Sequence, residues 1–268
     1  MNTHLTPQQQ LLSQLNALTT LPRPVLGQVV SLPNHAIATP HRHPWAQLSY
    51  ALKGVITVNT PTGQFVAPPT RAIMIPPGIE HGVHCSPHTV IRSLYIAADS
   101  LGQQHCQVLE IDPLLRELIV AFSLLPVEYD EHGAEGRLVA VLLDRLAQAQ
   151  PSDLMLPWPV DARLTELCRY LADHADCRQP LAHFSAQLGV SDKTLSRAFK
   201  RDTGMSFRQW RQRSRLLAAL PLLESGERIT DVALACGYDS LSAFIAAFKA
   251  LLGSPPGEYL KTKAEIRC

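Results

Sequence analysis

Two histidines, His41 and His43, lie two residues apart in the stretch ATPHRHPWAQLSYALKG, which is predicted to run as a β-strand. Side chains two apart on a strand point to the same face. A pair of imidazoles aimed at one place could bind a metal ion, line a small-molecule pocket, or belong to a polar strand face. The choice among these depends on the elements that position the pair.

The stretch around these histidines is predicted to form short antiparallel strands. Apolar runs rich in β-branched and aromatic residues are separated at close intervals by Gly or Pro, which is typical of a sandwich or barrel. The predicted strands are Leu48–Tyr50, Val55–Val58, Gln64–Val66, Ala72–Ile75 and Val90–Ile96. A β-rich unit of this kind would hold the two imidazoles against a sheet.

Two helices are predicted to follow the strands, between residues 110 and 150. The segments DPLLRELIVAFSLL and AEGRLVAVLLDRLAQA carry apolar residues at helical spacing. Each apolar face needs a partner surface, which is either the β-rich unit or a second subunit. Three prolines in QPSDLMLPWPVD then predict a linker at residues 151–161, and ARLTELCRYLADH reads as a supporting helix.

Composition restricts the class of protein. The 268 residues suffice for two domains, and 46% hydrophobic with 18% charged residues is a globular balance. No run of about 18 apolar residues occurs, and the N-terminus lacks the basic start and apolar core of a signal peptide. Six scattered cysteines without a CxxC pair suit a reducing compartment. We therefore expect a cytoplasmic protein without a membrane span.

The formal net charge of +1 hides a basic segment. Residues 1–180 carry 11 Lys or Arg against 15 Asp or Glu, whereas residues 181–216 carry eight against two. A localised basic segment on a nearly neutral chain indicates a face that binds a polyanion.

The C-terminal third contains an internal repeat. FKRDTGMSFRQW and FKALLGSPPGEY match at an offset of 49 residues, and LAHFSAQLGVSDKTLSRAF parallels ITDVALACGYDSLSAFIAAF upstream of them. The matched pairs include Phe199 with Phe248, Gly189 with Gly237, and Trp210 with Tyr259. Two copies in register predict one supersecondary unit that is used twice.

The first copy is predicted to fold as two helices joined by a glycine turn. Gly189 ends one helix, because Gly reaches positive φ without steric cost, and Ser191 caps the next. Leu195 and Phe199 would bury one face of that second helix and leave open Lys193, Thr194, Ser196 and Arg197. Two helices with this connection make a helix-turn-helix, whose second helix enters the major groove of DNA.

The second copy follows the same scheme. Thr230 is predicted to cap its first helix, Gly237 to make the turn, and Asp239 or Ser240 to cap its second helix. Phe244 and Phe248 would anchor that second helix to the core. Its open side carries Leu241, Ser242, Ile245 and Ala246. Between the copies, FRQWRQRSRLLAALPLLESG reads as a long basic helix that holds both units.

On these residues, the segment 165–263 resembles the DNA-binding domain of AraC/XylS-type bacterial transcription regulators. The doubled helix-turn-helix and the closing stretch ERITDVALACGYDSLSAFIAAFKALLGSPPGEYLK carry the resemblance. It implies an all-helical domain that sets two recognition helices into successive major grooves on one face of DNA. Carried over by position, the base-facing residues would be Lys193, Thr194, Ser196 and Arg197 in the first groove and Leu241, Ser242, Ile245 and Ala246 in the second.

The second copy departs from a common family pattern at Ala246, where many relatives carry Arg. Arg can bond guanine O6 and N7 in a bidentate way, whereas Leu, Ile and Ala only contact thymine methyl groups or exclude water. We therefore expect the first copy, and Arg197 in particular, to carry most direct base readout. Phosphate contacts are expected from Arg201, Arg208, Arg211 and Lys249.

The N-terminal part is similar to the cupin family. HRHPWAQLSYALKG matches the first half of the cupin pattern through His41, His43, Gln47 and a later Gly, and PPGIEH matches the second half, ending at His81. The resemblance implies a small barrel over about residues 25–98, the sensor fold that precedes many AraC/XylS-type DNA-binding domains. In metal-binding cupins the equivalent side chains converge on one divalent cation.

Gln47 stands where such cupins carry a carboxylate, and a neutral amide is a much weaker metal ligand. Two alternatives therefore stay open. In the first, His41, His43, Gln47 and His81 hold Fe, Mn, Ni or Zn, for which imidazole is a suitable ligand. In the second, a metal-free pocket contacts an organic effector through His41, His43, Trp45, Gln47, Tyr50 and His81.

Together these features predict a two-domain α+β protein. Residues 1–150 would form a cupin-type antiparallel β-barrel followed by helices, for effector sensing and dimerisation, and residues 162–268 an all-α domain with two helix-turn-helix motifs. We expect a sequence-specific transcription regulator, not an enzyme, that binds a double-stranded DNA operator and answers to a small-molecule or metal effector. Expected partners are a second copy, in a homodimer, and RNA polymerase if the protein activates. The alternative is a metal-dependent cupin enzyme with an accessory DNA-binding domain, against which Gln47 and the short barrel count.

Overall fold

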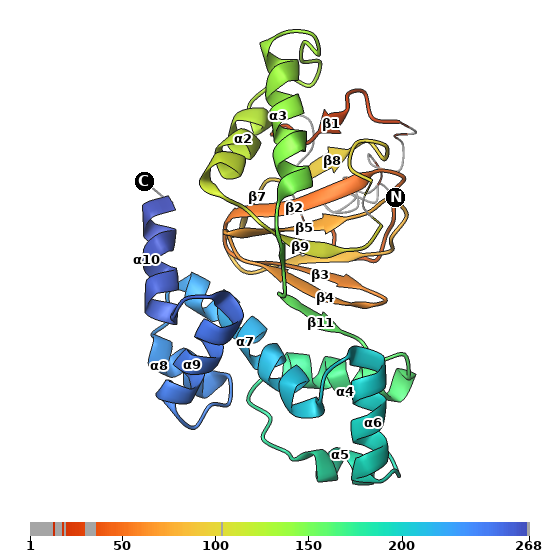
Figure 1. Cartoon of the computed structure of the whole chain (residues 1–268), viewed down its shortest axis with the longest axis vertical. Coiled ribbons are helices and arrows are strands. Elements are labelled where there is room, and N and C mark those ends of the chain that lie inside the picture. Colours follow the sequence, from red (N-terminus) through yellow and green to blue (C-terminus); the bar gives the residue numbers. More distant parts are fainter. Residues whose placement is uncertain (1–12, 14–17, 19, 30–35, 103, 267–268) are drawn as a thin grey trace, which may run out of the picture. The chain divides into compact units, whose positions relative to one another are not determined.

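The chain folds into two compact units, one of residues 1–60 and 65–153 and the other of residues 61–64 and 154–268 (Figure 1). The computed structural model describes residues 13, 18, 20–29, 36–102 and 104–266, with side chains to residue 261. Within these residues, no helix is both long enough and apolar enough to cross a bilayer.

Antiparallel strands form two sheets. The larger has the order β1-β8-β2-β5-β9-β10 with β7 also paired to β2, and the smaller has the order β11-β4-β3-β6. The strands are β1 Val25–Leu26, β2 Ala46–Lys53, β3 Ile56–Thr60, β4 Gly63–Ala67, β5 Arg71–Ile75, β6 Gly82–Cys85, β7 Val90–Ile91, β8 Leu94–Ile96, β9 Gln107–Glu110, β10 Pro151–Ser152 and β11 Met155–Pro157.

Each predicted strand overlaps a strand of the structure, with three corrections. The predicted strand Val90–Ile96 is divided at Arg92 and Ser93 into β7 and β8, both of which pair with β2. The paired histidines precede β2 rather than lying on it, because Pro44 cannot donate to a ladder and β2 begins only at Ala46. Three short strands before α2 were not predicted: β1 and β9, which belong to the larger sheet, with β9 beyond residue 98, and β6, which pairs with β3. Four residues are too few to show the alternation of a strand clearly.

Two helices cover the larger sheet, α2 Pro113–Ser123 and α3 Ala134–Gln148 (Figure 1). Their apolar faces share one core with β2, β5, β8 and β9, to which the helices contribute Leu115, Ile119, Phe122, Val139, Leu142 and Leu146. Of the two partner surfaces left open by the sequence, the sheet is therefore the one that these faces cover. Asp112 caps α2 by accepting from the Leu115 N–H at 2.8 Å, and it pairs with Arg145 of α3.

The second unit is helical. Its helices are α4 Ala162–Asp173, α5 Leu181–Gln187, α6 Asp192–Thr203, α7 Phe207–Ser225, α8 Ile229–Ala235, α9 Leu241–Leu252 and α10 Pro256–Ile266. The predicted repeat is visible in the packing. Phe199 contacts Trp210 with ring centroids 6.2 Å apart, and the matched Phe248 contacts Tyr259 at 5.6 Å. Each copy therefore builds its own aromatic core.

Glycine turns and serine caps define both helix-turn-helix motifs. Gly189 and Gly237 take φ values of 67° and 72°, which L-residues with a Cβ rarely adopt. Ser191 caps α6 and Ser240 caps α9, each by accepting the N–H of the third helical residue, Thr194 and Ala243 respectively. The predicted cap at Thr230 is wrong, since α8 already begins at Ile229.

The predicted linker is partly ordered structure. Residues 151–161 contain β10 and β11, and their second half belongs to the helical unit. There the Trp158 N–H donates to the Thr62 carbonyl at 3.0 Å, and the Trp210 indole N–H donates to the Pro157 carbonyl at 2.9 Å. Pro221 stands inside α7, and the helix continues past it to Ser225.

Candidate functional site

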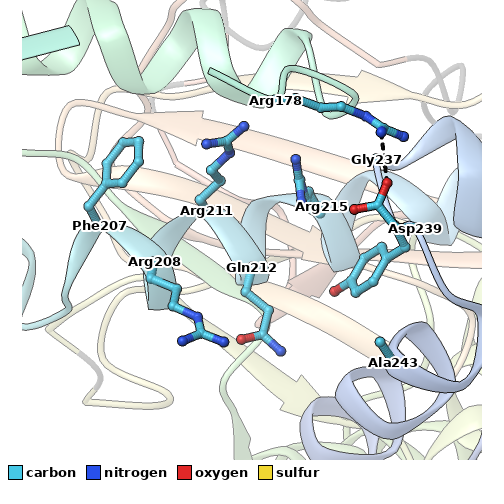
Figure 2. Close-up of a pocket in the computed structure, with 10 residues that line it drawn as sticks. Arg178, Phe207, Arg208, Arg211, Gln212, Arg215, Gly237, Asp239 and Ala243 are labelled. Carbon is cyan, nitrogen blue, oxygen red and sulfur yellow. Dashed lines mark ion pairs between the residues drawn. The ribbon is translucent and has the colours of Figure 1, made fainter. Parts of the chain in front are cut away.

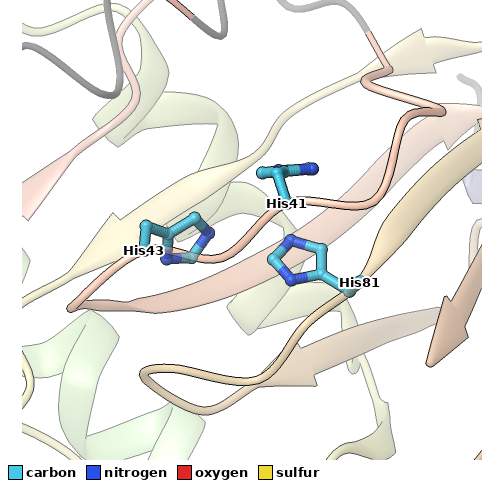
Figure 3. A group of neighbouring side chains, drawn as sticks. All are labelled: His41, His43 and His81. Atoms are coloured by element: carbon cyan, nitrogen blue, oxygen red, sulfur yellow. The ribbon is translucent and has the colours of Figure 1, made fainter. Parts of the chain in front are cut away.

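Three imidazoles, from His41, His43 and His81, gather in the first unit (Figure 3). An isolated antiparallel bridge joins the backbones of His41 and His81, with N–H to carbonyl distances of 3.0 and 2.9 Å. One ligand nitrogen of each ring lies within 4.8 Å of the other two. The two sequence segments that carry the histidines are thus brought side by side.

Backbone carbonyls fix the orientation of all three rings. Each Nδ1 lies 2.8–2.9 Å from a carbonyl oxygen, those of Thr39, Trp45 and Ile79 respectively. A carbonyl only accepts, so Nδ1 carries the proton and the Nε2 of each neutral ring presents a lone pair. Partners of this kind orient histidines that ligate metals.

Gln47 completes the cluster. Its Oε1 lies 2.9 Å from Nε2 of His43 and 3.3 Å from Nε2 of His81, and its amide nitrogen donates to Ser49 Oγ at 2.9 Å. In this orientation lone pairs face lone pairs. Two arrangements remove the conflict: a cation bound among the acceptors, or a rotated amide that donates to both imidazoles and accepts from the Ser49 hydroxyl.

Burial keeps the imidazoles neutral. His43 is 6% exposed and His81 is 1% exposed. Desolvation lowers the pKa of His41 and His43, and it lowers the pKa of His81 to about 3. Neutral imidazole is the form that binds metal. Nitrogen ligands of a tetrahedral zinc ion stand about 3.3 Å apart, so the rings would have to close by roughly an ångström around an ion.

Of the two aromatic residues predicted to line the pocket, Trp45 lies at the histidine cluster and Tyr50 does not. The Trp45 ring stacks on His43 with centroids 5.4 Å apart, and its buried Nε1 has no hydrogen-bond partner among the described residues. Tyr50 is not in the cluster. It lies in the core beneath α2 and α3, where its hydroxyl donates to the Pro69 carbonyl at 3.0 Å. Gln47 and Tyr50 are three apart on β2, so they point to opposite faces.

A tyrosine that the sequence analysis missed replaces Tyr50. Tyr95 of β8 lies opposite Gln47 in the ladder, and its ring meets the edge of His43 with centroids 5.8 Å apart. Only the pairing register identifies this neighbour, which no local sequence pattern reveals.

The predicted base-facing residues lie on the outer sides of α6 and α9. On α6, Leu195 and Phe199 are buried, whereas Lys193, Thr194 and Arg197 are exposed and Ser196 is half-buried. Arg197 has no ion-pair or hydrogen-bond partner among the described residues. On α9, the open residues are Leu241, Ser242 and Ala246, with Ile245 half-buried.

Helix α7 separates the two motifs. Its 19 residues correspond to a length of about 28 Å at 1.5 Å per residue. Recognition helices that enter successive major grooves need a separation of about 34 Å, one turn of the duplex. Since one motif precedes α7 and the other follows it, the length of α7 suits such an arrangement.

The residues predicted to contact phosphate differ in whether their side chains already have partners within the protein. Arg208 and Lys249 are exposed, whereas Arg201 pairs with Asp202 at 2.6 Å. Arg211 instead donates to the carbonyls of Cys177 and Gln179 and so holds the connection between α4 and α5. The structure does not favour Arg211 as a phosphate contact, because its donors are already used inside the unit.

Comparisons with known proteins agree with both parts of this architecture. Residues 184–262 match a family model described as a helix-turn-helix domain, and residues 24–143 match one described as an AraC-like ligand binding domain. The HTH-type transcriptional regulator NimR of Escherichia coli is 33% identical over 221 residues, 82% of this chain and 81% of that protein.

Other similarities cover less. The arabinose operon regulatory protein of Salmonella typhimurium is 32% identical over 49% of this chain and 46% of its own length. The solved DNA-binding domain of AdpA in complex with a target DNA is 30% identical over 40% of this chain, with a TM-score of 0.36.

A sensor-type β unit joined to two helix-turn-helix motifs defines a class: DNA-binding transcription regulators with a ligand-binding domain. Within that class, the chain belongs to the AraC family of HTH-type transcriptional regulators.

Proposed function

We propose that this regulator reads its operator mainly with α6, and that an effector bound at the histidine cluster of the first unit controls the reading. The first part rests on the guanidinium of Arg197, which is exposed and has no partner in the part of the chain that the structure describes. It has a free bidentate donor set for guanine, whereas the open side of α9 has no charged side chain among Leu241, Ser242, Ile245 and Ala246.

The remaining contacts would be divided by the same logic. Lys193, Thr194 and Ser196 would face bases beside Arg197 in the first groove. Arg201, Arg208 and Lys249 would bind phosphate, which positions the protein without reading sequence. α9 would fit thymine methyl groups or exclude water.

The sensing part of the proposal rests on the donor set. Three Nε2 lone pairs and the Gln47 oxygen fit a divalent transition metal held by His41, His43, Gln47 and His81. A bound ion would join the two histidine segments and offer an open position to a donor atom of an effector. The rotated-amide arrangement supports the other candidate, a metal-free pocket in which Trp45 and the imidazoles contact an organic ligand.

We propose a regulatory and not an enzymatic role for this cluster. Its fourth member is an amide, which neither donates nor removes a proton as a general acid or base. The related proteins are named as regulators. We place the protein in the cytoplasm, where its DNA partner is found and where the described cysteines, all free, would stay reduced.

A homodimer through α2 and α3 is part of the proposal. Both helices bury one face on the sheet, yet Leu114 is 54% exposed and Val141 is 45% exposed on them. An effector would act by binding one arrangement of subunits or units more tightly than another. Contact with RNA polymerase would follow if the output is activation.

The decisive experiment uses the full chain and a duplex that it selects from a random pool. Fluorescence anisotropy should show tighter binding to that duplex than to a scrambled one, in the range of 10³-fold or more. Binding changed by adding Zn²⁺ or Ni²⁺ after chelation would support metal sensing. Equal affinity for both duplexes would refute sequence-specific regulation.

A further inference from the structure

A basic cavity of about 440 Å³ opens beside α7 in the helical unit (Figure 2). Its lining comes from the connection between α4 and α5, from α7, and from the turn and first residues of α9. Four arginines contribute to the lining, Arg178, Arg208, Arg211 and Arg215, together with one carboxylate, Asp239. The cavity thus lies between the connection that precedes the first helix-turn-helix motif, the long helix α7 and the turn of the second motif.

The cavity keeps an excess of positive charge. Arg178 pairs with Asp239 at 2.7 Å, which uses the only carboxylate in the lining. Arg211 and Arg215 donate to backbone carbonyls of residues 175–179, and such carbonyls orient a guanidinium without neutralising it. Figure 2 shows these two arginines on one side of α7 and Arg208 with Gln212 on another.

Two groups in the lining have no internal partner. Within the described part of the chain, Arg208 makes no ion pair or hydrogen bond. The Tyr238 hydroxyl is buried and also unpartnered, although a buried hydroxyl normally finds a hydrogen bond. Burial raises the pKa of Tyr238 to about 12, so the hydroxyl stays protonated and donates. A guanidinium and an unpaired hydroxyl at one cavity call for an anion with several acceptor oxygens.

The start of α9 adds to this chemistry. Ala243 lines the cavity from the first turn of α9; its own N–H donates to the Ser240 hydroxyl, and Leu241, Ser242 and Ala243 are all exposed. Helix N-termini attract phosphate through free N–H groups and the helix dipole. Gln212 is exposed at the same cavity and offers an amide donor.

We infer that this cavity is a phosphate site, and that it receives a backbone phosphate of the DNA segment between the two major grooves. The site rests on the proposed function, since α7 would then span the duplex between the two recognition helices. Arg208, Gln212 and Tyr238 donate hydrogen bonds to the phosphate. The positive charges of Arg211 and Arg215 attract the phosphate without contacting it. A free phosphate or a phosphorylated metabolite has the same chemistry, so the experiment separates the sources.

The first variant is Tyr238→Phe in the full chain, which removes only the hydroxyl. Because that hydroxyl has no partner in the described structure, the thermal midpoint should stay equal or rise. Affinity for the selected duplex and for scrambled DNA should fall by roughly tenfold or more, by the loss of one hydrogen bond to a charged group. Tyr259→Phe is the control: its hydroxyl donates to Glu224, so the midpoint should fall while DNA affinity is kept.

The second variant is Arg208→Gln, compared with Arg169→Gln on α4. Loss of one phosphate contact should reduce the slope of log affinity against log salt by about 0.9, whereas the control should keep the slope. Wild-type protein that binds no DNA would refute the proposed function itself. Wild-type DNA binding, with unchanged affinity in Tyr238→Phe and an unchanged slope in Arg208→Gln, would overturn the phosphate site and the Arg208 contact but leave sequence-specific regulation in place.

Inorganic phosphate distinguishes the source of the anion. If millimolar phosphate raises the midpoint of the wild-type chain but not of Tyr238→Phe, and both bind the duplex equally, the site takes a small phosphorylated ligand and the DNA assignment is wrong. Competition between phosphate and duplex, lost in Tyr238→Phe, would support the DNA assignment.

Discussion

The Nε2 atom of His43 lies 2.9 Å from Oε1 of Gln47, and in this orientation of the amide neither atom carries a proton. This contact makes the cluster sensitive to the chemistry of one side chain. A cation would turn the facing lone pairs into ligands, and a rotated amide would turn them into hydrogen-bond partners.

Metal affinity should depend on the residue at position 47. Gln47→Glu supplies the carboxylate that divalent ions prefer, so Zn²⁺ or Ni²⁺ should bind the chelator-treated variant at least about tenfold more tightly than wild type. His81→Ala should abolish binding, and His84→Ala, at an exposed position, should not change it. Isothermal titration calorimetry measures each case. If neither wild type nor Gln47→Glu gives a heat of binding, the metal site is excluded and the metal-free pocket is supported.

Stability without metal should fall as the pH decreases. Burial holds the pKa of His81 at about 3, below the 6.5 of an unfolded chain, so below pH 6.5 the unfolded state binds the additional proton. Between pH 7.5 and 5, this one group should cost roughly 2 kcal/mol in urea unfolding of chelated protein. His81→Leu should reduce the difference between the two pH values. An unchanged difference would assign it to other groups.

Base readout should separate two arginines of the same helix. Arg197→Ala should weaken binding to the selected duplex by about 1–3 kcal/mol and relax the base preference at one position. Arg201→Ala should weaken selected and scrambled DNA alike, because a phosphate contact carries no sequence information. Anisotropy titrations on single-base variants of the duplex provide the test. Identical profiles for both mutants would contradict the assignment.

Substitution by Ala should destabilise the protein by different amounts at the two turn glycines, Gly189 and Gly237. Gly189→Ala meets nothing within 4 Å, so only the strain of positive φ, about 1–2 kcal/mol, should appear in urea unfolding. A Cβ at Gly237 would stand 2.9 Å from Nη2 of Arg215 and 3.0 Å from the Ala175 carbonyl. Gly237→Ala should therefore destabilise more than Gly189→Ala. Equal losses would show that Arg215 moves away without cost.

Dimerisation should respond to the outer faces of α2 and α3. Val141→Arg places a charge on the exposed apolar position of α3 and should shift sedimentation equilibrium towards monomer by tenfold or more in Kd, about 1.4 kcal/mol. Val160→Arg, which alters an 88% exposed valine elsewhere, is the matched control. A monomeric wild-type chain would remove this interface from the proposal.

The sequence predicted the elements whose signals are local. Periodicity, glycine turns and serine caps identify the doubled motif, and the matched aromatic pairs, Trp210 and Tyr259 among them, take equivalent places in both cores. The histidine half-motifs also meet as their resemblance implies.

What the sequence did not predict depends on pairing between distant segments. Tyr95 reaches His43 only through the register of β8 on β2. Arg211 looked like a surface cation, yet the fold places carbonyls of a preceding loop against it. The unpartnered hydroxyl of Tyr238 likewise follows from packing around α7, which no residue pattern encodes.

The continuity of α7 past Pro221 has a consequence for the promoter. Because α7 is one continuous helix between the two motifs, it fixes the rotation and the distance of one recognition helix relative to the other. One inserted base pair rotates the second contact by about 34° and shifts it by about 3.4 Å. Operators of this protein should therefore tolerate base changes at the second element better than any change in spacing.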